Sequence, residues 1–106
     1  MTPERLTTLL AERVLGWSVG PDRFLTGKRG WLPRWRFRPT ENLSDAFRLL
    51  EAATPDGYTM GSGENGVFWA RVVILGVVGE ARQASQARAI TFAIARALGL
   101  EVDSYE

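Results

Sequence analysis

The sequence predicts one α+β domain, a small antiparallel sheet packed with helices in the order α-β-α-β-β-α. Three segments carry apolar residues at helical spacing, and the segments between them alternate or contain glycine-rich turns. The 106 residues fit a single domain, which at this size buries roughly two-thirds of the surface of its unfolded chain. We therefore expect residues 1–106 to share one core.

The first helix is expected from Pro3 to Gly16. Proline suits the first helical position because its missing N–H has no partner there. Gly16 ends the helix because glycine adopts the left-handed conformation without a Cβ clash. The apolar stripe consists of Leu6, Leu9, Leu10 and Val14. Residues 18–30 contain proline and glycine without any period, and we expect them to be irregular.

Residues 31–38 alternate in the way of a short strand. The two sides of this strand are Trp35 with Phe37, and Arg34 with Arg36 and Arg38. Pro33 and Pro39 flank it, which favours an edge position because proline cannot donate a ladder hydrogen bond.

A second helix follows Pro39 and fades at Ala53. Thr40 or Asn42 is its expected cap, and Asn42 with Asp45 three residues on has an approximate capping-box form. After the turn at residues 54–57, we expect a hairpin that joins a short strand, 58–60, to a long one, 67–78, through a glycine-rich turn. The last helix is expected from Glu80 to Leu98 and ends at Gly99.

The long strand is apolar on both faces, which predicts a central strand covered by helices on both sides. Trp69 is then buried. If helices cover only one face, Trp69 lies instead on an open surface, which would be a site for a partner. The other members of that surface are Val67, Val73 and Leu75.

Three stretches resemble the phage ABA-sandwich domain family. They are residues 11–17 (AERVLGW), residues 39–47 (PTENLSDAF) and residues 87–95 (ARAITFAIA). They follow the family's order: a helix end running into Gly-Trp, a capped helix bearing alanine and an aromatic residue, and an alanine-rich last helix. The resemblance implies an α/β sandwich and a phage or prophage origin. It carries over no catalytic residue, and the cysteine that members often have in the last helix is absent here.

The composition argues against catalysis. The chain has no histidine and no cysteine, which excludes thiol chemistry and the usual zinc ligands. Lys28 is the sole lysine, and no two carboxylates share a diagnostic spacing. We expect no enzyme, no cofactor and no metal.

Charge and hydropathy indicate which partners and which cellular location to expect. The net charge of +1 and the lack of a basic helix stripe do not favour nucleic acid. The longest apolar run, residues 72–78, is too short to cross a bilayer. The chain shows no signal peptide, so we expect it in the host cytoplasm.

Two features suggest a ligand site. Residues 61–66 match G-x-G-x-x-G, but a strand follows where a dinucleotide fold needs a helix, so this is a hairpin turn or at most a phosphate-contacting loop through Ser62 and Gly63. The arginine run forms either a solvated edge strand or a cationic face for an anion or nucleotide. That face would comprise Lys28, Arg29, Trp31, Arg34, Arg36 and Arg38.

Two functions follow from these observations. The leading hypothesis is a non-catalytic phage accessory protein that acts by protein–protein interaction or self-association. The alternative is a small-molecule binder, such as an anti-defence protein that sequesters a nucleotide signal.

Overall fold

The structure, a computed structural model, describes residues 3–27 and 30–100. The helices are α1 (Pro3–Leu10), extended by a π-helical segment (Ala11–Leu15), α2 (Leu43–Ala52) and α3 (Gln86–Ala97). The strands are β1 (Ser18–Val19), β2 (Arg23–Leu25), β3 (Trp31–Pro33), β4 (Gly57–Ser62), β5 (Phe68–Ile74) and β6 (Val77–Gln83). Two short 3₁₀ turns, Arg34–Arg36 and Glu64–Gly66, complete the chain.

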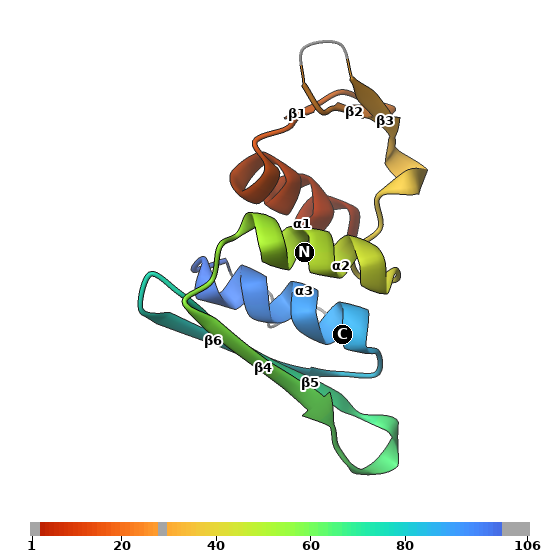
Figure 1. Cartoon of the computed structure of the whole chain (residues 1–106). Coiled ribbons are helices and arrows are strands. Elements are labelled where there is room, and N and C mark those ends of the chain that lie inside the picture. Colours follow the sequence, from red (N-terminus) through yellow and green to blue (C-terminus); the bar gives the residue numbers. More distant parts are fainter. Residues whose placement is uncertain (1–2, 28–29, 101–106) are drawn as a thin grey trace.

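The molecule is a stack of layers with a sheet at each end (Figure 1). The larger sheet is an antiparallel meander, β4-β5-β6, and the smaller one is β1-β2-β3. Helix α3 packs on the larger sheet, α2 packs on α3, and α1 lies between them and the smaller sheet. All three helices lie on the same side of the larger sheet, so its opposite face is open within the described part of the chain.

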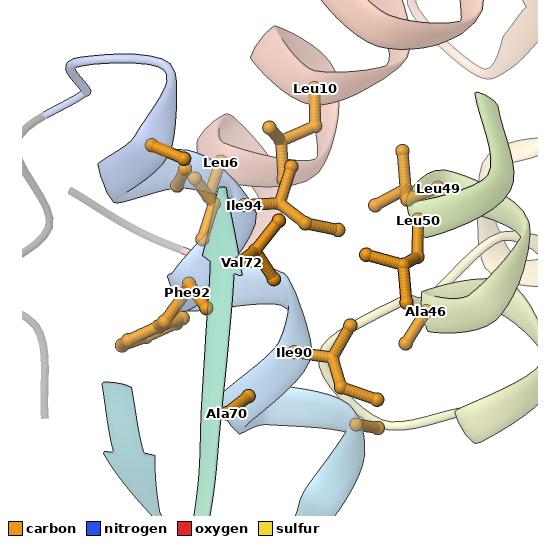
Figure 2. Close-up of a cluster of buried hydrophobic side chains, with 14 of the residues drawn as sticks. Leu6, Leu10, Ala46, Leu49, Leu50, Ala70, Val72, Ile90, Phe92 and Ile94 are labelled. Atoms are coloured by element: carbon orange, nitrogen blue, oxygen red, sulfur yellow. The ribbon is translucent and has the colours of Figure 1, made fainter. Parts of the chain in front are cut away.

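The core surrounds α3, where nine residues of one helix are buried (Figure 2). Ile90 and Ile94 point from α3 toward the other helices, and Val72 of β5 lies beside them on the sheet side of the core. Leu50 of α2 and Leu10 of α1 face them from the other two helices. A helix with so much buried surface sits between two layers, as α3 does here.

The smaller sheet is held by an aromatic cluster. Trp17, Phe24 and Phe37 are buried, with ring centroids 5.0–5.8 Å apart. Such tilted and edge-on arrangements suit the ring quadrupoles. Trp17 reaches this cluster because Gly16 takes the left-handed conformation, φ 70°, at the end of the first helix.

Several predicted boundaries are confirmed. The Asn42 side chain accepts a hydrogen bond from the Asp45 backbone N–H at 3.1 Å, which caps α2. Gly16, Gly66 and Gly99 all have positive φ, as expected at helix ends and in a hairpin turn. Asn65 also has positive φ, 61°, so the Asn-Gly pair turns the chain as predicted.

The prediction of one long strand over residues 67–78 is wrong. The chain turns back at Leu75 and Gly76, whose φ values are 51° and 79°, so the segment divides between β5 and β6. The last helix consequently begins at Gln86, after Ser85 caps it, instead of at Glu80. The short strand expected at residues 58–60 extends over β4, Gly57–Ser62.

The prediction for the segment 18–38 is also wrong in two respects. The irregular region contains the small sheet, and the expected strand 31–38 stops at Pro33 and continues as a 3₁₀ turn, Arg34–Arg36. Helices cover one face of β5 only, so Trp69 is not enclosed between two layers. The arrangement matches the alternative expectation, in which helices cover one face and Trp69 lies on the open one.

Candidate functional site

The open face of the larger sheet is the candidate site. The strand register places its side chains in rows across β5 and β6: Trp69 opposite Arg82, Arg71 opposite Glu80, and Val73 opposite Val78. Alternate residues of a strand share a face, so Ala70 and Val72, which are buried beneath α3, mark the other side. The open face therefore changes along its length from an aromatic and cationic end to an apolar end.

The cationic end is a shallow depression of about 670 Å³. It is lined chiefly by Trp69, Arg71, Glu80, Arg82, Gln83 and Arg96. Arg96 comes from α3 and reaches the edge strand β6, where its Nη1 donates a hydrogen bond to the Glu80 carbonyl oxygen at 2.7 Å. Three guanidinium groups against one carboxylate give this end a net positive charge.

Two of these charged side chains are already paired. Arg71 Nε lies 3.5 Å from Glu80 Oε1, and both side chains are exposed. Arg82 is exposed and has no hydrogen-bond or ion-pair partner among residues 3–27 and 30–100. The pairing leaves Arg82 as the guanidinium of this face that is available to an anion.

Trp69 is held in place by the strand beside it. Its register partner on β4 is Gly61. A Cβ added there would lie 2.9–3.0 Å from three adjacent indole atoms, Cζ2, Cε2 and Nε1. Nearly equal distances to three bonded ring atoms place Gly61 beneath the face of the ring, so the indole lies across β4.

The apolar end lies at the β5–β6 turn. Leu75 is 89% exposed, Val78 is 44% exposed, and Val73 is half-buried. Asp56 fixes this turn, because its Oδ2 accepts a hydrogen bond from the Gly76 N–H at 2.9 Å. Of the predicted interface residues, Trp69 and Val73 thus share the open face and Leu75 sits at its tip, while Val67 precedes β5 and is half-buried.

The predicted arginine face is divided: Arg34 and Arg38 line one smaller hollow with Trp35, and Arg36 does not line it. Arg34 is structural: it donates hydrogen bonds to the Gly20 carbonyl oxygen at 3.2 Å and to Thr8 Oγ1 at 2.7 Å, and it lies over the ring of Phe24. Arg36 stacks on Trp35, and Arg38 pairs with Glu41 at 2.9 Å. A 3₁₀ turn has three residues per turn, so residues two apart do not share a face as they do in a strand.

The other predicted ligand residues are scattered. Trp31 is exposed beneath the guanidinium of Arg23, and Arg23 in turn binds Asp22 and lowers the pKa of its carboxyl group through a side-chain hydrogen bond. Lys28 and Arg29 lie outside the described residues. Ser62 ends β4 and Gly63 begins the β4–β5 turn, and neither lines the depression or the smaller hollow beside Arg34. Trp31 belongs to the smaller sheet and lies at the other end of the stack from Ser62 and Gly63, so the structure does not bring these three residues together (Figure 1).

The described residues lack two kinds of feature. They contain no group of three acidic, histidine or cysteine side chains that would hold a metal ion. None of their helices has both the length and the apolarity of a membrane span.

Comparison with solved structures finds a shared fold. A crystal structure of a phage protein from Bacillus cereus ATCC 14579 matches with a TM-score of 0.75 at 18% sequence identity, over 95% of this chain and 91% of that chain. No protein-family model matches the chain, and no curated protein matches it in sequence. At 18% identity the likeness concerns the fold, and the resemblance to the ABA-sandwich family stays a prediction.

Sequence reasoning missed Arg82 and Arg96 as partners on one site. It placed both on the last helix, where they do not share a face. Gly76 is the signal in the sequence that could have distinguished their positions. If Gly76 is the second residue of a tight turn, a new strand follows it, so Arg82 lies on that strand and Arg96 on the helix after it.

Proposed function

We propose that this chain is a non-catalytic phage or prophage accessory protein that self-associates through the open face of the β4-β5-β6 sheet. The observation that carries the proposal is Leu75. It is an apolar side chain with positive φ at an exposed turn, which is unfavourable both for its backbone, by about 1 kcal/mol, and for its hydration. A contact that covers the turn offsets the second cost.

A second copy suits this face because of its charges. Arg71 and Glu80 neutralise each other in the middle of the face, so two copies meet without an excess of one sign there. The chain as a whole carries a formal charge of +1, which adds little repulsion between copies. A two-fold contact would bring the apolar residues of both copies together and shield them from water.

The phage assignment draws its support from the fold. The structural neighbour is a phage protein, and the three sequence stretches resemble a phage family. A role without catalysis is favoured by a chain that has no histidine or cysteine. The family membership, the host-cell location and the lack of enzymatic activity all belong to this proposal.

The test compares two neighbouring valines on opposite faces. Val78→Glu places a carboxylate on the open face, and Val77→Glu places one on the helix side at similar exposure, 50% against 44%. Because an isologous contact repeats the substitution in both copies, we expect Val78→Glu to weaken the dimer at least about tenfold. Sedimentation velocity over a wide concentration range measures this, with Val77→Glu as the matched control.

Two results would contradict the proposal. One is that the unsubstituted protein sediments as a monomer at every concentration. The other is that Val77→Glu weakens the dimer as much as Val78→Glu does. The second result would move the contact to another surface.

A further inference from the structure

The cationic end of the open face has features that self-association does not use. It lies at the opposite end of β5 and β6 from Leu75, in the rows of Trp69 and Arg71. Its depression of about 670 Å³ is within the range of small-molecule sites, roughly 300–1,000 Å³. Such sites combine an apolar surface with a few convergent polar groups, and here these are an indole, guanidinium groups and one amide.

The guanidinium groups favour a ligand with a negative charge. Arg82 is exposed without a partner in the described part of the chain, and the paired Arg71 lies in the next row. Guanidinium groups bind phosphate through two parallel hydrogen bonds. Glu80 repels an anion from its own side, but its carboxylate is engaged by Arg71, which leaves the approach to Arg82 open.

The indole of Trp69 favours a ligand that contains a planar base. The Trp69 ring lies against Gly61 and is half-buried, so the ring is supported and part of it remains accessible to a ligand. Stacking of a planar base on an aromatic side chain contributes about 1–3 kcal/mol and tolerates any base. Trp69 and Arg82 pair in the register of β5 and β6, and both line the depression, so a ligand that lies across the sheet from β4 to β6 can touch both.

We infer that this depression binds a nucleoside phosphate, with the base on Trp69 and the phosphate on Arg82. Arg71 supports the phosphate from the neighbouring row, and Arg96 closes the depression from the helix side. The ligand is bound and not transformed. This inference is tested separately from self-association at Trp69 and Arg82, which lie two rows from Val73 and Val78; the Arg71–Glu80 row between them belongs to both proposals.

The test uses AMP, ADP and ATP as probes, with adenosine and inorganic phosphate as fragments, in isothermal titration calorimetry of the full chain. We expect a nucleotide to bind more tightly than either fragment. Arg82→Gln removes the charge of an exposed side chain, so the fold is retained and the dissociation constant rises about tenfold, equivalent to about 1.4 kcal/mol. Trp69→Phe keeps an aromatic ring and weakens binding less than Trp69→Ala does.

Arg36→Gln is the matched control, because Arg36 is an exposed arginine outside the depression. Four results would overturn the inference: none of the nucleotides binds at millimolar concentration; Arg82→Gln and Arg36→Gln have equal effects; inorganic phosphate binds as tightly as the nucleotides; or an oligoglutamate peptide binds more tightly than they do. Val78→Glu should leave nucleotide binding unchanged. The test of nucleotide binding is then independent of the test of dimerisation.

Discussion

At the scale of single residues, the absence of a side chain decides how closely the layers approach. Gly79 of β6 is buried under α3 and pairs with Val72. A Cβ at this position would collide with the carbonyl oxygen of Ala93 and the backbone nitrogen of Ala97. Because both atoms belong to the backbone of a helix, no side-chain rotation relieves the overlap. Alanines at 93 and 97 complete the close contact from the helix.

Gly79→Ala is therefore expected to destabilise the monomer by about 3 kcal/mol, the upper part of the usual range for overpacking. Urea denaturation followed by circular dichroism measures the change. Gly57→Ala is the matched control on β4, since a Cβ there meets nothing within 4 Å, and its effect should stay within about 0.5 kcal/mol. Equal effects of the two substitutions would contradict the close approach of α3 to β6.

The roles of some single residues can be predicted from the sequence, and the roles of others cannot. The caps at Asn42 and Gly99 are predictable, because each depends on neighbours within a few positions. The role of Arg34 is not, since its partners Thr8 and Gly20 are 26 and 14 residues away. The depression has the same difficulty: Trp69, Arg82 and Arg96 meet only after two strands and a helix are in place.

At the scale of elements, the β5–β6 hairpin is the feature that the sequence conceals. Two-residue hairpin turns of type I′ require positive φ at both central positions, and the usual pair is Asn-Gly. Here the pair is Leu75-Gly76, so the apolar run continues through the turn and resembles one long strand. The missed turn also moved Arg82 onto a helix. The Asn65-Gly66 turn has the usual residues, and it was predicted.

Leu75→Asn should stabilise the monomer by about 1 kcal/mol, because asparagine adopts the left-handed conformation more readily than leucine. The same substitution removes an exposed apolar side chain from the proposed contact, so the dimer should weaken. Denaturation at a concentration where the protein is monomeric separates the first effect from the second. A loss of stability in the monomer would show that Leu75 is a packing residue, which would remove the main support for the proposed function.

At the scale of the whole molecule, the arrangement of layers cannot be read from the patterns of the separate elements. The two-sided apolar pattern around Trp69 and Val73 predicts two helical covers, but all three helices stack on one side (Figure 1). The stack extends 43 Å along its longest axis. Helix α3 buries two sides of its own surface, against the sheet and against α2, and α1 lies beyond α2, so no helix of the described residues covers the open face. The pattern of α3 is consistent with either arrangement.

The long stack also predicts uneven stability, because its two sheets differ greatly in size. Each strand of the smaller sheet has two or three residues, and Phe24 is the one buried residue among them. Each strand of the larger sheet has six or seven residues. Elements with few buried apolar contacts open at lower free energy than the core. We therefore expect the amide of Phe24 in β2 to exchange with solvent through a smaller opening than that of Val72 in β5.

Native-state hydrogen exchange followed by NMR measures both opening free energies. Phe24→Leu should lower the protection of β2 and β3 and leave that of β5 unchanged, because the aromatic cluster lies at one end of the stack. Ile90→Val is the control: it shortens a side chain of the shared core at a cost of about 0.5–1.5 kcal/mol, and should lower protection in β5. If the two amides exchange with equal free energies and equal denaturant dependence, the stack unfolds as one cooperative unit and the smaller sheet is not a separate part of it.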